Sequence, residues 1–126
     1  MNKQTINTTN APAPIGPYSQ AVKANGFLFC SGQIALHPQT GELMIADLET
    51  ETKQVMANIK ALLDEAGISF GNIVKTSIFL SDMSLFAKVN EIYGSYFSAD
   101  FPARETVAVK TLPRNVNVEI SVTAVL

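Results

Sequence analysis

Two charged side chains in this sequence have the chemistry that a small-molecule site needs. Arg104 stands at the entrance to one alternating segment, and Glu119 lies in the middle of another. A guanidinium offers a rigid fork of donors that matches a carboxylate, and a carboxylate within a strand is costly to bury without a partner. Each residue has an ordinary alternative: Arg104 pairs with Asp100 or Glu105, and Glu119 faces solvent.

The other reactive side chains give weaker signals. Tyr18 is either a cleft residue or a core aromatic with a satisfied hydroxyl, and Ser31 and Gly32 belong to a short polar segment, "SGQ", that means little alone. His37 precedes a proline in a turn, which is typical of a surface histidine. Cys30 lies in an apolar segment and is typical of a buried free cysteine, so a Cys–His nucleophile pair has no support.

Composition narrows the class of protein. At 126 residues the chain has the length of a single domain, residues 1–126, with one hydrophobic core. Only 16% of the residues are charged, against about 25% on average, so either part of the surface is hidden in an oligomer or the surface is rich in neutral polar residues. A net charge of −2 without a Lys/Arg cluster argues against a nucleic-acid-binding protein.

Residue counts and hydropathy set further limits. One cysteine and one histidine exclude an intramolecular disulfide and a conventional structural zinc site, and no pattern supports a metal held by carboxylates. The polar N-terminus lacks the apolar region of a signal peptide, and no stretch has the ~18 apolar residues of a membrane span. We therefore expect a soluble cytoplasmic protein with no membrane partner.

Periodicity predicts the elements that must position these residues. An Asn25-Gly26 turn between two apolar runs is a hairpin signal, and apolar residues at i, i+3, i+4 and i+7 before Gly67 predict a helix. The expected strands are 18–24, 27–34, 72–81, 105–112 and 116–125, and the expected helices are 47–66 and 82–98, with Asp82 or Ser84 as cap of the second.

This order of elements predicts an α+β domain with a mixed sheet and both helices on one face. The strand–helix–strand unit over 73–111 should be a parallel crossover, and the first 17 residues a loop or short edge. Because the other sheet face must then be polar or covered, self-association through that face is the natural solution.

Taken together, five segments resemble the reactive intermediate deaminase family, also called the Rid or YjgF family. They cover nearly the whole chain in the family's order: "NAPAPIGPYSQAV" (10–22), "FLFCSGQIALHPQTGEL" (27–43), "NIVKTSIFLSDMSLFAKVNEIYGSYF" (72–97), "FPARETVAV" (101–109) and "LPRNVNVEISVTA" (112–124). The resemblance implies a chorismate-mutase-like fold and a homotrimer with sites between subunits. It also implies hydrolysis of 2-imino acids, formed from the enamines that pyridoxal-phosphate enzymes release, to 2-oxo acids and ammonia. Imines derived from threonine and serine, 2-iminobutanoate and 2-iminopropanoate, would be the typical substrates.

The resemblance also assigns roles by position. Arg104 matches the arginine that grips the substrate carboxylate, and Glu119 matches the acid that holds and deprotonates the attacking water. No metal or bound cofactor is required, since an iminium carbon is already electrophilic. Further matches to cleft positions are Tyr18, Ser31, Gly32, Asn90 and Thr106, and the expected pocket walls are Ile34, Leu36 and Phe86.

Two points complicate this assignment. If 105–112 and 116–123 formed a simple hairpin, Arg104 would lie roughly 17 Å from Glu119, so either the last strand lies elsewhere in the sheet or a neighbouring subunit completes the site. Position 105 is usually small and polar in the family, but here it is Glu105. Strand alternation should point Glu105 away from Arg104; otherwise it would compete with substrate for the guanidinium.

Other functions stay open at this stage. A non-catalytic module that binds small carboxylates, or a protein-interaction module, would need only Arg104 and would survive the loss of Glu119. A ribonuclease or translation inhibitor has been proposed for relatives of the family, but the acidic pI of about 5.3 argues against it.

Overall fold

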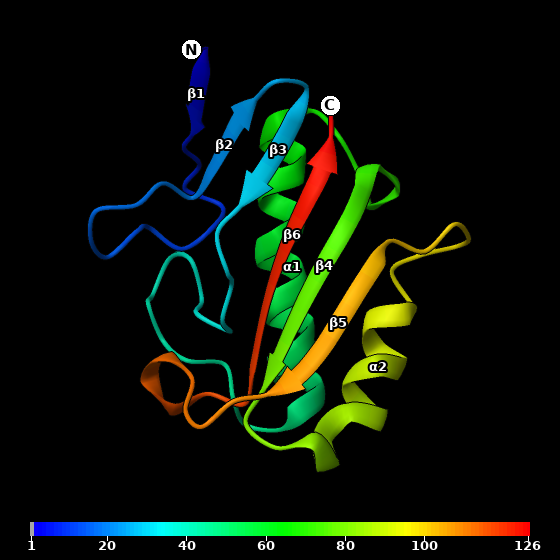
Figure 1. Cartoon of the computed structure of the whole chain (residues 1–126). Coiled ribbons are helices and arrows are strands. Elements are labelled where there is room, and N and C mark those ends of the chain that lie inside the picture. The colour runs from blue at the N-terminus through cyan, green and yellow to red at the C-terminus, as the bar shows by residue number, and fades with distance from the viewer. Residues whose placement is uncertain (1) are drawn as a thin grey trace.

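The computed structural model describes residues 2–126 and contains one six-stranded mixed sheet with two α-helices (Figure 1). The strands lie in the order β1-β2-β3-β6-β4-β5. Their bounds are β1 Lys3–Ile6, β2 Ala21–Ala24, β3 Phe27–Cys30, β4 Ile73–Leu80, β5 Ala103–Ala108 and β6 Val118–Val125, and the helices are α1 Leu48–Ala66 and α2 Phe86–Gly94.

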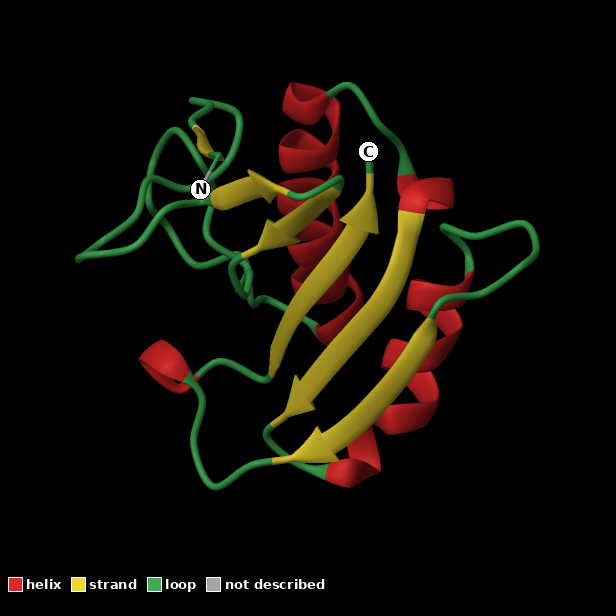
Figure 2. Ribbon diagram, turned by 45° about the horizontal axis from the view of Figure 1, so that its top comes forward, coloured by secondary structure: helices red, strands yellow, loops and turns green. Residues whose placement is uncertain are grey.

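Both helices pack on the same face of the sheet, as Figure 2 shows. α1 contacts β6, β3 and β1, and α2 packs beside α1. Leu28, Ile78 and Ile120 point from three strands into this layer, and Ile59 and Leu62 meet them from α1. The α+β class, the mixed sheet and the single helical face are therefore confirmed.

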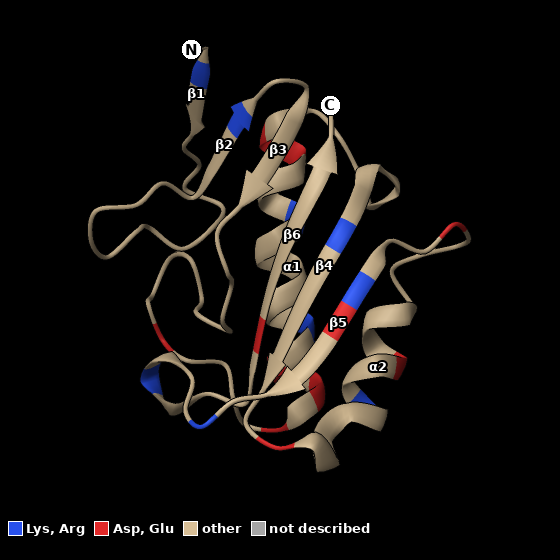
Figure 3. Cartoon of the chain, in the orientation of Figure 1, with Lys and Arg blue, Asp and Glu red and all other residues tan. Residues whose placement is uncertain are grey.

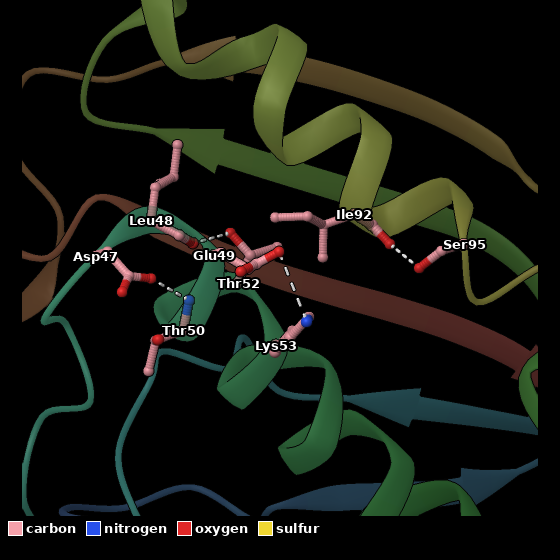
Figure 4. Close-up of polar contacts among 8 residues, drawn as sticks. All are labelled: Asp47, Leu48, Glu49, Thr50, Thr52, Lys53, Ile92 and Ser95. Carbon is pink, nitrogen blue, oxygen red and sulfur yellow. Dashed lines mark hydrogen bonds and ion pairs between the residues drawn. The ribbon is translucent and has the colours of Figure 1, made fainter.

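Helix α1 has the ends that its sequence predicts. The Asp47 carboxylate accepts a hydrogen bond of 2.7 Å from the Thr50 N–H, which satisfies a donor that the first turn leaves free (Figure 4). Gly67 ends the helix in the left-handed conformation at φ 77°, where a side chain would be strained.

The connections decide where the last strand lies. Asn25 and Gly26, both with positive φ, join β2 to β3 as a tight hairpin. β4 runs parallel to β5, with α2 in the connection between them, so the predicted parallel crossover is confirmed. β6 inserts antiparallel between β3 and β4 and does not pair with β5. The last strand therefore does not form a hairpin with β5, which is one of the two alternatives given above for Arg104 and Glu119.

Several predicted boundaries were wrong, each for a local reason. Strand 18–24 begins only at Ala21, because the preceding residues form a tight turn and a side-chain-bonded loop. Strand 27–34 ends at Cys30 and resumes only as a bridge from Gln33 to Ile120. The predicted helix 82–98 starts with a 3₁₀ turn capped by Asp82 and ends at Gly94.

The two terminal predictions were also shifted. The strand predicted at 105–112 begins at Ala103, two residues before the predicted start, and ends at Ala108. The strand predicted at 116–125 begins at Val118. The first 17 residues contain the short edge strand β1, which pairs antiparallel with β2.

The second face of the sheet is open in this chain. Phe27, Phe29 and Val107 are exposed there, and Lys75 and Glu105 form an ion pair of 2.8 Å. Apolar side chains among neutral and paired polar ones make a surface suited to association. Self-association through this face stays a prediction.

Candidate functional site

The first candidate site is a cavity of about 450 Å³ around Glu119. Its walls come from the loop before β2, the segment after β3 and the turn before β6. The residues that line it are Pro12, Ala13, Ile15, Tyr18, Gln20, Ser31, Gly32, Gln33, Ile34, Leu36, Pro113, Arg114 and Glu119. The structure therefore brings together four predicted site residues, and it places the two predicted walls Ile34 and Leu36 beside them.

Glu119 and Gly32 are held against each other by the backbone. Gln33 N–H donates to the Ile120 carbonyl at 2.8 Å, and Ile120 N–H donates back to Gln33 at 3.1 Å. This bridge lays Gly32 directly over the Glu119 side chain. A Cβ at Gly32 would overlap the Glu119 carboxylate and lie 3.0 Å from its Cδ. Only glycine leaves room for the carboxylate in this position.

The environment of Glu119 changes its protonation. Burial raises the pKa of its carboxyl above the ordinary value of 4.5, because the charged form loses solvation. A carboxylate with a raised pKa is a stronger base than an exposed one. Glu119 is thus suited to take a proton from a water molecule in the cavity.

Ser31 and Tyr18 are fixed by local hydrogen bonds. The Ser31 hydroxyl donates to the Ser19 carbonyl at 2.6 Å, and the Tyr18 hydroxyl accepts from the Ile15 N–H at 3.2 Å. The buried Gln20 side chain holds the surrounding loop through bonds to the backbone, at Thr8, Ala11 and Pro12. The Tyr18 ring is about half exposed at the rim of the cavity.

Arg104 lies in a second, separate cavity of about 450 Å³ between β5 and α2. One guanidinium nitrogen donates to Asn90 Oδ1 at 2.8 Å, and the guanidinium carbon stands 5.7 Å from the Phe86 ring centre and 5.3 Å from that of Tyr93. The amide and the two rings hold the guanidinium in one orientation. Tyr93 in turn donates to Thr76 Oγ1 at 2.9 Å, which fixes its ring.

The two charged residues face opposite sides of the sheet. Arg104 pairs with Thr76 and Glu119 pairs with Phe79 on the shared neighbour β4. Because alternate residues of a strand point to opposite faces, positions 76 and 79 project in opposite directions. Within one chain, the structure therefore does not bring Arg104 and Glu119 together, even though β6 lies elsewhere in the sheet.

Glu105 points away from Arg104, as alternation predicts. Its carboxylate pairs with Lys75 and accepts a hydrogen bond from the Ser77 hydroxyl on the open face. These two bonds lower the pKa of the Glu105 carboxyl, and the bond from Lys75 has the larger effect. Glu105 does not compete for the guanidinium, and among residues 2–126 Arg104 has no ion pair with Asp100 either.

The remaining sequence candidates have clear positions. Thr106 lies on the Arg104 face, and its buried hydroxyl oxygen has no hydrogen-bond partner among the described residues. His37 Nδ1 accepts from the N–H groups of residues 39 and 40, which is a turn role. Cys30 is buried, and burial raises the pKa of its thiol to about 12, so the thiol is unreactive.

Tyr93, Gln33 and Arg114 are among the residues of these cavities that sequence reasoning missed. Tyr93 belongs to the apolar spacing of the predicted helix 82–98, and the same spacing places it one turn after Asn90. Gln33 and Arg114 enter the Glu119 cavity through the sheet bridge and through a turn in which Arg114 has a positive φ of 54°. No local sequence signal marks either of them.

Two further features of residues 2–126 bear on the class of protein. No helix within residues 2–126 is both long and apolar enough to cross a membrane. The same part of the chain holds no cluster of three or more His, Cys, Asp or Glu side chains suited to a metal ion.

Comparison with known proteins gives consistent matches over the whole chain. The sequence model of the family described as Endoribonuclease L-PSP matches residues 8–126. A RutC family protein of Synechocystis is 54% identical, covering 100% of this chain and 98% of the relative. A mouse protein named 2-iminobutanoate/2-iminopropanoate deaminase is 46% identical over 98% of this chain and 91% of its own. A crystal structure of a Rid family protein of unknown function from Yersinia pestis superposes with a TM-score of 0.97 at 48% identity, covering 99% of this chain and 100% of that one.

Proposed function

The chain belongs to the Endoribonuclease L-PSP family, which includes the reactive intermediate deaminases, and from that premise we propose that it hydrolyses 2-imino acids to 2-oxo acids and ammonia. The proposed substrates are 2-iminobutanoate and 2-iminopropanoate. The observation that carries the proposal is the half-buried Glu119, packed on Gly32 in a cavity of small-molecule size.

The proposed site is composite and needs a second copy of the chain. Glu119 with Tyr18, Ser31 and Gly32 forms one half-site, which we call the glutamate half-site. Arg104 with Asn90, Phe86 and Thr106 forms the other, the arginine half-site. Each half lies on a different face of the sheet and lacks what the other supplies. A homotrimer in which the glutamate half-site of one subunit faces the arginine half-site of the next is the assembly that we propose.

The proposed reaction adds water across a C=N bond. Arg104 binds the substrate carboxylate through its donor fork, with the guanidinium already oriented by Asn90 and two aromatic rings. Glu119 takes a proton from water while the oxygen attacks the iminium carbon and the C=N bond becomes a single bond. Glu119 then returns this proton to the nitrogen, and it accepts the proton of the new hydroxyl group as the C–N bond breaks, the carbonyl forms and ammonia leaves. General base catalysis of about 10²–10⁴-fold, together with orientation, suffices for an electrophile that is already activated. The proposed chemistry uses no cofactor.

The compartment that we propose is the cytoplasm. A single cysteine, buried and unpaired, fits a reducing environment.

The direct test is a coupled assay. A threonine or serine dehydratase generates the short-lived imine in semicarbazide, and formation of the 2-oxo acid is followed with and without this protein. We expect the wild type to outcompete the trap, and Arg104→Ala and Glu119→Gln to lose the effect. A wild type that does nothing, yet binds a small 2-oxo acid through Arg104, would instead support the non-catalytic binding module.

The composite arrangement has its own test. Arg104→Ala and Glu119→Gln, each inactive alone, are mixed, unfolded and refolded together. Mixed assemblies then contain some interfaces in which an intact Arg104 faces an intact Glu119, so activity should return. No return of activity in assemblies that contain both variants would refute a site shared between chains.

The family description names an endoribonuclease, and the charge distribution of this chain favours that function less than the deaminase. Figure 3 shows Lys and Arg spread over the fold and interspersed with Asp and Glu, and Lys75 is already paired with Glu105. Binding to RNA needs several phosphate-neutralising cations on one surface.

A further inference from the structure

Helix α1 carries a buried carboxylate and a buried amide on its core face, seven residues apart. Glu51 has no exposed surface, and Asn58 is 1% exposed. A spacing of seven residues places both side chains on the same side of the helix. Burial of a carboxylate and an amide is costly unless each is fully hydrogen-bonded, so their partners indicate what these positions do.

Glu51 holds the beginning of β6. Its Oε2 accepts hydrogen bonds from the backbone N–H groups of Asn117, at 2.7 Å, and Val118, at 3.0 Å, while its Oε1 accepts from Asn117 Nδ2 at 2.9 Å. The next residue along the strand is Glu119. The backbone that carries the proposed general base is therefore pinned from the opposite side of the sheet by a second carboxylate.

Asn58 holds the opposite wall of the same cavity. Its Nδ2 donates to the Ile34 carbonyl at 3.0 Å and to the Leu36 carbonyl at 2.9 Å, and its Oδ1 accepts from Gln54 at 2.9 Å. Ile34 and Leu36 both line the Glu119 cavity. This wall is irregular backbone, so these two bonds replace the ladder that a strand would supply.

The contacts of Asn117 extend the link to the other half-site. Ser81 donates to Asn117 twice, from its hydroxyl to Oδ1 at 2.9 Å and from its N–H to the carbonyl at 3.0 Å. Ser81 directly follows β4 and precedes Asp82, the cap of the turn that leads into α2. α2 carries Asn90, which orients Arg104.

We propose that Glu51 and Asn58 are positioning residues, through which α1 sets the geometry of the glutamate half-site. Glu51 fixes the place of the Glu119 backbone, and Asn58 fixes the wall formed by Ile34 and Leu36. The kinetic part of this proposal rests on the proposed deaminase function; the structural part does not. Neither side chain touches substrate, because both are buried and their polar atoms are bonded to other groups of the protein.

Two conservative changes at Glu51 separate the reach of its side chain from its charge. In Glu51→Gln the amide oxygen can still accept from both backbone N–H groups, and the amide nitrogen can donate to Asn117 after its side-chain amide rotates. In Glu51→Asp the charge stays, but the shorter side chain retracts from both N–H groups. A positioning role therefore predicts a higher kcat for Glu51→Gln than for Glu51→Asp, and a purely electrostatic role predicts the reverse.

The experiment measures kcat and KM per folded molecule for both variants of the full chain. We expect Glu51→Asp to lower kcat by roughly 10–100-fold, since misplacement of a reacting group by about 1 Å costs of that order, with KM nearly unchanged. Glu51→Gln should retain kcat to within about fivefold. An Asp variant with wild-type kcat, or one more active than the Gln variant, would overturn the proposal.

Thr52→Val supplies the matched control. Thr52 is as buried as Glu51 and adjacent to it, but its hydroxyl donates only within the helix, to the Leu48 carbonyl at 2.8 Å (Figure 4). It should keep the wild-type kcat and KM per folded molecule. Asn58→Ala should raise KM instead, because the wall that meets the substrate moves; unchanged KM would remove Asn58 from the proposal.

A second readout needs no substrate. Hydrogen exchange of the Asn117 and Val118 amides should accelerate in Glu51→Asp and stay slow in Thr52→Val, relative to amides in the middle of β4. If the wild type is inactive yet these amides are released, the deaminase proposal fails while the anchoring stands. If the amides stay protected, the positioning proposal fails whatever the activity.

Discussion

Glycine at position 32 should be required for catalysis and dispensable for folding. A Cβ at this position would overlap the Glu119 carboxylate and stand 3.0 Å from its Cδ and 3.3 Å from its Cγ. Ordinary carbon contacts are about 3.5–4.0 Å, so the carboxyl group must move by at least about 0.5 Å and its oxygen by about 1 Å or more. The obstructed atoms end a flexible side chain, so the strain is relieved by rotation of Glu119 and the backbone stays in place.

Gly32→Ala should therefore lower kcat by roughly 100-fold while leaving thermal stability close to that of the wild type. The coupled imine assay gives kcat, and calorimetry gives the melting temperature. Gly71→Ala is the matched control, because its Cβ would meet only Ser69 Oγ at an ordinary 3.7 Å. A Gly32→Ala variant with wild-type kcat would refute the placement of Glu119 as the base, and one that fails to fold would refute the claim that only the side chain yields.

Four other outcomes follow from the described contacts and charges. Burial raises the folded-state pKa of Glu119, so the stability linked to its protonated form is complete below pH 4.5 and is lost as the pH rises through the raised pKa. Glu119→Gln should therefore melt at a higher temperature than the wild type at pH 7. A pH series of melting curves should show this gain vanishing below pH 4.5. Arg104→Lys keeps the charge but loses the two-pronged donor, and should raise KM by roughly 10–100-fold in the coupled assay, whereas an unchanged KM would mean that the carboxylate binds elsewhere. The Cys30 thiol, with a pKa of about 12, should resist a thiol reagent at pH 8 until the protein is unfolded. The intact protein should show no salt-dependent retention on an RNA or heparin column, because its cations are not gathered on one surface.

Local signals in the sequence predicted the elements well where the pattern was strong. The apolar stripe of α1, its Gly67 end and the Asn25-Gly26 hairpin were confirmed because each depends on neighbours in the chain. For the first 17 residues the prediction left a loop or a short edge open, and β1 is a short edge strand. Its bounds had no clear signal, since three of its four residues are exposed and only Ile6 enters the core. The second helix was too long in prediction because the apolar spacing continues through Phe97, past the residue at which the helix ends.

The geometry of the site depended on information that periodicity does not contain. The residue types of Arg104 and Glu119 indicated their chemistry, but the pairing registers of β5 and β6 with β4 decide which faces they occupy. The contact of Gly32 with Glu119 arises from a bridge between segments almost 90 residues apart. The polar anchors Glu51 and Asn58 lie on the apolar side of the helix, but the helical pattern does not indicate which distant backbone groups they bind.

The division of Arg104 and Glu119 between the two faces of one sheet bears on how activity would scale with the amount of protein. Under the composite-site proposal, an isolated chain holds two incomplete halves and turns over nothing. Specific activity would then fall on dilution below the dissociation constant of the assembly, and the rate would rise more steeply than linearly with protein concentration in that range. A cell could set the rate of imine clearance through the abundance of this chain alone, without an effector or a covalent modification.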